Sequence, residues 1–334
     1  MSADYEVDLW GRVRNNVSVN ELTALSRRYG YVTVLLTTQA SVANTYFAIL
    51  QGREELRVQE ANLAAARRVL AVIRTQVEAG TATGLDLAQQ ETVVAQQDAA
   101  VPPLRQTVAS NEAALATLAG TALPALRVGD VRLDRLAVPA VGAGVPSELL
   151  ARRPDVLSAE ADLRSANANV AVARAALFPT VTLSAQGGFT SALIGTLLRP
   201  EAQFYSILAS LAQTVFDAGE RQARVEQSRA QSEELLANYR LTILTALSDT
   251  ETALNALRET TEQERLLREA LARAERAQAI AEEQLRGGTI NLITLLNTQT
   301  TVFTARRNLT RGQLQRLQAA VGLFRNLGGG GGRA

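Results

Sequence analysis

The residues that most enzymes use for chemistry are sparse in this sequence. It contains no histidine and no cysteine, which removes thiol nucleophiles, histidine proton shuttles, disulfides and the commonest zinc sites. Carboxylates are numerous, and they include the pairs Glu233-Glu234 and Glu282-Glu283. We interpret these pairs as solvated charge, because they fall on expected exposed helix faces and form no cluster around a pocket. We therefore expect no enzyme activity, no cofactor and no metal site.

The composition favours long helices that pack closely through small residues. The chain has 334 residues, of which 47% are hydrophobic and only 4% aromatic, and alanine and leucine dominate. The net charge of +1 gives no electrostatic argument for a nucleic-acid partner. No apolar stretch approaches the roughly 20 residues of a membrane-spanning helix. The first five residues lack the features of a secretory signal.

The sequence repeats itself at a fixed offset of 208 residues, without a gap, over about 110 positions. The clearest matches are glycines: Gly11 with Gly219, Gly80-Thr81 with Gly288-Thr289, and Gly120 with Gly328. The match predicts one supersecondary unit used twice, with the two copies related by pseudo-symmetry. We assign residues 1–120 to the first repeat, 121–146 to an irregular connector, 147–328 to the second repeat and 329–334 to a flexible tail.

Hydrophobic spacing predicts two long helices, at about residues 15–79 and 220–286. A helix of about 65 residues would be roughly 95 Å long. Each is followed by a glycine turn and a returning helix, at about residues 85–118 and 292–327. Pro102-Pro103 predicts a break in the first returning helix. We expect Tyr31, Tyr46 and Tyr239, which follow the apolar spacing, to be core residues.

Alternating polarity predicts short strands at residues 5–13, 178–186 and 203–215. The last two would form a hairpin with a loop near residues 195–200, and Ser147 would cap a helix that precedes them and runs to about residue 177. Two strands and a helix precede Gly219, whereas one strand precedes Gly11. We therefore expect that about 60 residues of the first repeat lie before Met1, and that this chain is an N-terminally shortened form.

Each strand has hydroxyl or acidic groups on one side, aliphatic groups on the other and aromatic residues near its ends. The aromatic residues are Tyr5, Trp10, Phe178, Phe189, Phe204, Tyr205 and Phe216. This pattern fits an outer-membrane barrel strand, and it also fits a half-buried strand of a soluble sheet. Four strands in a complete chain are too few for a barrel of at least eight, so closure would need several chains, and three would give twelve strands.

Several segments carry a family resemblance that covers essentially the whole chain. Residues 148–160 contain Arg152, Arg153, Pro154 and Asp155, and residues 166–179 end in Phe178-Pro179. These segments closely resemble the outer-membrane efflux proteins of the TolC and OprM type, and most closely their NodT lipoprotein branch. Residues 5–12, 80–87 and 216–219 match further family motifs in the right order.

The resemblance implies a mainly α-helical protomer of a homotrimeric channel-tunnel in the outer membrane of a Gram-negative bacterium. Its strands would share a twelve-stranded transmembrane β-barrel, and its helices would form an α-helical barrel through the periplasm. Solutes from an inner-membrane efflux pump would pass through a periplasmic adaptor protein and leave by passive conduction. An alternative from another class is a soluble periplasmic coiled-coil scaffold or adaptor, and an enzyme is a third.

The resemblance also implies that the two glycine turns are periplasmic tips, which contact the adaptor and constrict the tunnel. The tip residues would be Gly80, Thr81, Thr83, Gly84, Asp86, Gly287, Gly288, Thr289, Thr294 and Asn297. Relatives often carry acidic residues where this sequence has Thr294 and Asn297, so Asp86 would supply charge instead. Its alternative role is in a capping box with Thr83.

Two further groups complete the predicted site residues. Arg152, Arg153 and Asp155 are expected one turn inside a helix start, either as a structural anchor at the connector or as solute contacts. Tyr5, Trp10, Phe204, Tyr205 and Phe216 would be membrane-interface aromatics.

Overall fold

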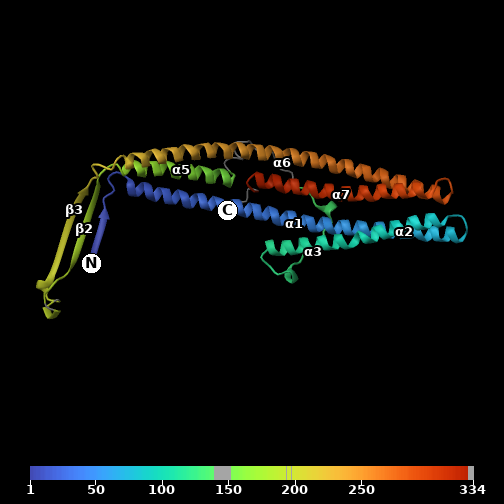
Figure 1. Ribbon diagram of the computed structural model, residues 1–334, viewed down its shortest axis with the longest axis horizontal. Coiled ribbons are helices and arrows are strands. Elements are labelled where there is room, and N and C mark those ends of the chain that lie inside the picture. Colours follow the sequence, from blue (N-terminus) through green and yellow to red (C-terminus); the bar gives the residue numbers. More distant parts are fainter. Residues whose placement is uncertain (139–151, 193, 197, 330–334) are drawn as a thin grey trace. The chain divides into compact units, whose positions relative to one another are not determined.

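The computed structural model describes residues 1–138, 152–192, 194–196 and 198–329, which form mainly α-helices and one small sheet (Figure 1). The described residues fall into two units. The first unit comprises residues 1–33 and 150–246, and the second comprises residues 34–149 and 247–334. Helices α1 (Arg12–Glu78) and α6 (Glu220–Arg286) each contribute to both units. The predicted cap Ser147 lies outside the described residues.

The sheet of the first unit has three antiparallel strands in the order β1 (Ser2–Glu6), β2 (Thr180–Phe189) and β3 (Gln203–Ala212). The predicted hairpin of β2 and β3 is confirmed, and the segment between them contains the short helices η3 (Ile194–Thr196) and η4 (Pro200–Ala202). Directly opposed residues share a face of the sheet. The register therefore gives one face the rows Tyr5-Leu183-Ala209 and Ala3-Ala185-Ile207.

The other face of the sheet is mostly polar. Its rows are Ser2-Gln186-Ser206, Asp4-Ser184-Leu208 and Glu6-Thr182-Ser210. The hydroxyl of Ser184 donates a hydrogen bond to the Asp4 carboxylate at 2.6 Å. Leu208 places an aliphatic side chain among these polar ones, and the register also puts Phe204 and Ala212 on this face.

The first strand is shorter than the sequence predicts. The alternation extends to Val13, but β1 ends at Glu6 and α1 begins at Arg12. Gly11 adopts a φ of 79°, which turns the chain, and the Asp8 carboxylate accepts hydrogen bonds from the backbone N–H groups of Val13 and Arg14, both at 2.9 Å. Helix capping therefore overrides the local alternation, since it satisfies donors that a strand would leave unpaired.

Helix α5 (Pro154–Ala175) packs against the first part of α1 through small side chains. The hydroxyls of Ser26 and Ser158 lie 3.0 Å apart, and those of Thr23 and Ser165 lie 3.3 Å apart. Small residues of this kind allow two helices to approach closely. Ala161, Ala166 and Ala175 of α5 are also buried.

In the second unit the first returning helix is broken as predicted. Helix α2 (Gly84–Ala99) ends just before α3 (Val101–Leu118), which begins with Pro102-Pro103. Gln59 of α1 stabilises the break, because its amide donates to the carbonyl oxygen of Gln97 at 2.7 Å. The second returning helix, α7 (Leu292–Asn326), is continuous. At positions offset by 208 from the two prolines it has Thr310 and Arg311.

The chain that follows α3 lies on α1 and α7. It contains the short helices η1 (Leu123–Ala125) and η2 (Leu133–Arg135). Leu133 is buried in a cluster with Leu50 and Leu317. The Arg53 guanidinium donates to the carbonyl oxygens of Val128 and Gly129, both at 3.2 Å. This part of the predicted connector is therefore held by packing and hydrogen bonds.

Helix bounds and glycine conformations recur at the offset of 208 residues. Helices α1 and α6 both contain 67 residues, begin at residues 12 and 220, and end at 78 and 286. Positive φ angles occur at three pairs of glycines with the same separation, namely Gly11 and Gly219, Gly80 and Gly288, and Gly120 and Gly328. Glycine adopts such angles without the steric cost that a Cβ atom adds.

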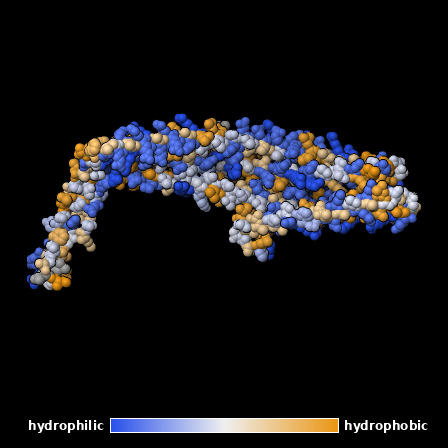
Figure 2. Space-filling view, in the orientation of Figure 1, coloured by the Kyte–Doolittle hydropathy of each residue, from blue (hydrophilic) through white to orange (hydrophobic). Residues whose placement is uncertain are grey.

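The expectation that Tyr31 is a core residue is wrong for the single chain. Tyr31 is 67% exposed, whereas Tyr46 packs against the cluster around Leu50 and Tyr239 is partly buried. Hydrophobic residues are scattered among hydrophilic ones over the visible surface (Figure 2). Helical spacing identifies an apolar stripe on a helix, but it does not specify which part of that stripe a neighbouring helix covers.

Candidate functional site

The two turns between paired helices end α1 and α6 in the same way. We call them the first turn (79–83) and the second turn (287–291). Gly80 and Gly288 have φ angles of 73° and 69°. The N–H of Thr81 donates to the carbonyl of Gln76 at 2.8 Å, and the N–H of Thr289 donates to that of Gln284 at 2.9 Å. Each glycine and threonine thus closes the C-terminus of a long helix.

The helices that leave the two turns begin with different caps. At the first turn the Asp86 carboxylate accepts from the N–H and hydroxyl of Thr83, at 2.8 and 2.7 Å, and the N–H of Asp86 donates to the Thr83 hydroxyl at 3.2 Å. This capping box confirms the structural alternative that the sequence offered for Asp86. The hydroxyl bond, with the backbone bond, lowers the pKa of Asp86 below its ordinary value.

Asn291, which was not among the residues predicted from the sequence, caps the helix at the second turn. Its side-chain oxygen accepts from the N–H and hydroxyl of Thr294, at 3.0 and 2.8 Å. The available signal was an asparagine directly before the apolar start of α7. Thr294 stands where the first turn has Asp86, at the offset of 208 residues, so the second turn carries no charge at this position.

The remaining predicted tip residues lie at or near the surface. Gly84, Thr294 and Asn297 are exposed, as is Gly287. The second residue of each returning helix is an exposed aliphatic, Leu85 in α2 and Ile293 in α7. Each turn therefore presents one apolar side chain among polar caps.

An apolar cluster joins the helices directly beneath the turns. Its buried members are Ile73 of α1, Ala281 of α6, and Leu292 and Leu295 of α7. Leu87 of α2 packs against them. The turns at the ends of the two hairpins are therefore supported by one shared core.

In the first unit, the predicted family segment forms the start of α5. Pro154 is the first residue of α5 and Arg153 is its N-cap, so the expectation that Arg153 and Asp155 lie one turn inside a helix is wrong. Proline fixes the helix start here because its missing N–H would be unpaired in any case. Arg152 is exposed, whereas Arg153 is buried.

Arg153 connects the start of α5 with α6. Its guanidinium pairs with Asp155 at 2.6 Å and donates to the backbone carbonyl of Ala246 at 3.1 Å. Burial by itself raises the pKa of Asp155, but the hydrogen bonds and charge of Arg153 together lower it below its ordinary value. The contacts are those of a structural anchor on α6.

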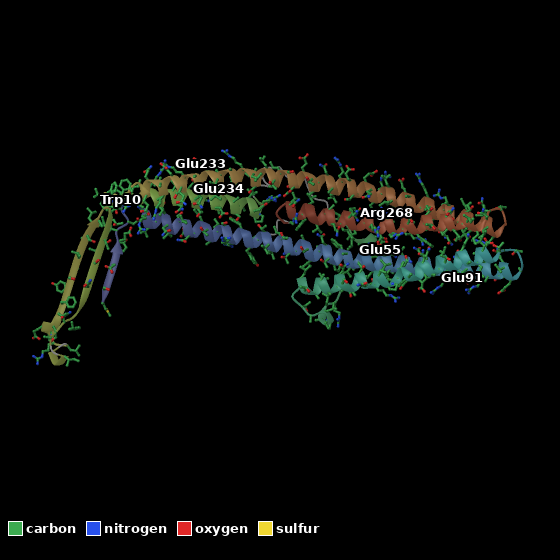
Figure 3. All side chains as sticks on the ribbon, viewed as in Figure 1. Trp10, Glu55, Glu91, Glu233, Glu234 and Arg268 are labelled. Carbon is green, nitrogen blue, oxygen red and sulfur yellow. The ribbon has the colours of Figure 1, made fainter. Side chains whose placement is uncertain are left out.

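Aromatic residues gather where the sheet meets the helices. Trp10 lies at this junction (Figure 3). It stacks on Phe178 with a ring-centroid distance of 4.7 Å, and its indole N–H donates to the carbonyl of Pro179 at 2.8 Å. Of the other predicted interface aromatics, Tyr5, Phe204, Tyr205 and Phe216 are exposed. Phe178-Pro179 therefore positions Trp10, a contact that the sequence did not predict.

The described residues contain no group of histidine, cysteine, aspartate or glutamate side chains that could hold a metal ion. Glu233 and Glu234 are both exposed on α6 (Figure 3). Among the described helices, none has the length and the hydropathy needed to cross a membrane.

Comparison with known proteins identifies the relatives of this chain. Residues 1–121 and 145–329 match the family described as outer membrane efflux protein. The pyoverdine export outer membrane protein OpmQ of Pseudomonas aeruginosa is 41% identical over 332 residues, which cover 99% of this chain and 69% of the relative. The probable efflux pump outer membrane protein TtgC of Pseudomonas putida is 31% identical, over 98% of this chain and 67% of the relative.

A solved structure of a membrane protein from Pseudomonas aeruginosa has the same fold. It superposes with a TM-score of 0.92 and 28% identity, over 98% of this chain and 76% of that protein. The family match, the relatives and the solved structure all cover the segment around Arg153 and the two glycine turns, on which the resemblance in the sequence rests. The chain belongs to the outer membrane efflux protein family and acts as an outer-membrane efflux component.

Proposed function

We propose that this chain is one protomer of a homotrimeric channel-tunnel, and that solutes pass through it from an inner-membrane pump and a periplasmic adaptor to the cell exterior. The observation that carries the proposal is the two-sided sheet. One face has rows such as Tyr5-Leu183-Ala209, and the other has rows such as Glu6-Thr182-Ser210. A transmembrane barrel needs this division, because one face contacts lipid and the other contacts water.

Barrel closure requires more strands than this chain holds. The described sheet has three strands and open edges, and open edges are not stable in the hydrocarbon region of a membrane. We infer that strands of several copies complete a shared barrel. The exposed aromatics Phe204, Tyr205 and Phe216 would lie near the membrane interfaces.

The repeated element bounds support an internal repeat with an offset of 208 residues. We infer that residues 1–120 and 147–328 are the two repeats, joined by residues 121–146 and followed by a tail at 329–334. Each repeat would contribute one long helix and its returning helices to an α-helical barrel in the periplasm. We infer that Tyr31, exposed in the single chain, is covered by a neighbouring copy there.

The two turns would form the end of the tunnel that meets the adaptor. Each displays an exposed aliphatic residue, Leu85 or Ile293, beside a polar cap. A photo-crosslinking residue at either position should capture the adaptor in cells. The same residue at Glu233, which is exposed on α6, is the control. Equal capture from all three positions would contradict adaptor contact at the turns.

Channel activity is tested with protein isolated in detergent from bacterial outer membranes. We expect a chemically crosslinked trimer and stepwise ion conductance after insertion into planar bilayers. A water-soluble protein that forms no trimer and conducts no ions would support the coiled-coil scaffold instead. A bacterial strain that keeps the pump but lacks this protein should export the solute of the pump again only when this protein is restored.

A further inference from the structure

Two glutamines are buried between the helices on the side of the apolar cluster that faces away from the turns. Gln299 of α7 is 1% exposed, and neither its side-chain oxygen nor its nitrogen has a hydrogen-bond partner among the described residues. Gln90 of α2 is 0% exposed. Its nitrogen donates to the carbonyl of Ala66 at 2.8 Å, and its oxygen has no partner among the described residues.

These positions are close to the turns along the helices. Gln299 lies one turn beyond Leu295, and Gln90 lies about one turn beyond Leu87, and both leucines belong to the packing beneath the turns. Apolar residues at these two positions would pack without the loss of any hydrogen bond to water. A buried amide without a partner instead loses its hydrogen bonds to water and gains none from the protein.

Water has a route to the Gln299 side of this packing. A groove of about 390 Å³ is lined by residues of α1, α2, α3 and α7, including Asn62, Gln96, Gln299 and Arg307. Glu55 of α1, labelled in Figure 3, also lines it and pairs with Arg311 at 3.3 Å. Because Gln299 is itself part of the lining, a small separation of α2 from α7 would expose its amide to water.

We propose that the Gln299 amide is a built-in weak point between α2 and α7, which favours separation of the two hairpins at their turns. This inference rests on the proposed function, in which the turns form the end of the tunnel. Packing holds the hairpins together through the apolar cluster, while the unpaired amide gains hydrogen bonds only when they separate. Gln299 would therefore shift the balance toward an open end without contacting the solute.

The test replaces the amide with an apolar group of similar length, Gln299→Met. We expect hydrogen exchange of the backbone amides in residues 84–93 and 292–303 to slow about tenfold, because the compact arrangement no longer buries an unpaired group. The fraction of time that the channel conducts in planar bilayers should fall by a similar factor. Gln299→Leu, with another shape and no polar side-chain atom, should act in the same direction.

The matched control is Gln96→Met. Gln96 lies on α2, lines the same groove and is exposed, so its replacement should leave both measurements unchanged. Faster exchange in Gln299→Met would overturn the inference, because it would show that the Gln299 amide has a hydrogen-bond partner in solution. Gln90, the other of these two buried glutamines, would be the first candidate for that partner. Slower exchange with unchanged conductance would also overturn it.

The outcome can be separated from the test of the proposed function. If the unsubstituted protein neither trimerises nor conducts, the proposed function fails, whatever the variants do. If it conducts and Gln299→Met matches it in exchange and conductance, only the inference about Gln299 fails.

Discussion

The guanidinium of Arg153 donates a hydrogen bond to the backbone carbonyl of Ala246, 93 residues further along the chain, at 3.1 Å. The same guanidinium pairs with Asp155 in the first turn of α5. One buried cation therefore fixes the start of α5 both to its own helix and to α6. This contact explains why an arginine, with its several donors in a fixed fork, occupies the position.

Replacing Arg153 should destabilise the first unit. Arg153→Met keeps an unbranched stem but removes the guanidinium and leaves Asp155 without its cation, and we expect a loss of about 2–3 kcal/mol in the free energy of unfolding. Arg152→Met is the control, because Arg152 is exposed and its replacement should change stability by less than about 0.5 kcal/mol. Denaturant titration of both variants measures the difference, and equal stabilities would contradict the anchor.

The glycines of the two turns should not tolerate a side chain. Gly80→Ala and Gly288→Ala force a Cβ atom into a left-handed backbone conformation, which costs about 1–2 kcal/mol per position. Gly84 begins α2 without a positive φ and has open space around it, so Gly84→Ala should be neutral or stabilising. Thermal unfolding of the three variants checks that Gly80→Ala and Gly288→Ala are less stable than Gly84→Ala. A loss of stability in Gly84→Ala alone would contradict this prediction.

Acid should loosen the first turn and leave the second unchanged. The pKa of Asp86 is lowered by its bonds to Thr83, so its stabilising effect is complete above the ordinary aspartate value of about 3.9 and is lost as pH falls through the lowered pKa. Asn291, the cap of the second turn, does not titrate. We expect hydrogen exchange, corrected for its intrinsic pH dependence, to accelerate below about pH 4 in residues 83–87 only.

The control for the acid experiment is Asp86→Asn. It removes the titrating group but keeps a side-chain oxygen, so the extra acceleration at low pH should disappear. If the variant keeps the acid response of the unsubstituted protein, the capping carboxylate is not its source.

Trp10 is the single tryptophan of the chain, so its fluorescence reports on one place. In the proposed channel it lies near the membrane interface, where indole rings concentrate, and brominated lipids should quench its emission. A variant with Trp10→Phe and Glu233→Trp moves the reporter to an exposed position on α6 and should not be quenched. Equal quenching in both proteins would contradict an interfacial Trp10.

Local patterns predicted most of the elements, since helix spacing, prolines and caps act within a few residues. The break at Pro102-Pro103 and the capping box of Thr83 and Asp86 are examples. The extent of β1 was wrong because the bonds of Asp8 to the next helix competed with the alternation. Asn291 was missed although its signal was local.

The sequence by itself determined the two long helices, their turns and the two-sided strands, because each follows from the polarity and backbone preferences of neighbouring residues. Only the tertiary structure decided that Arg153 reaches Ala246, that Trp10 stacks on Phe178 and that Gln299 is buried without a partner among the described residues. These contacts join residues distant in the sequence or depend on which side of a helix its neighbours cover. Periodicity alone does not specify such packing.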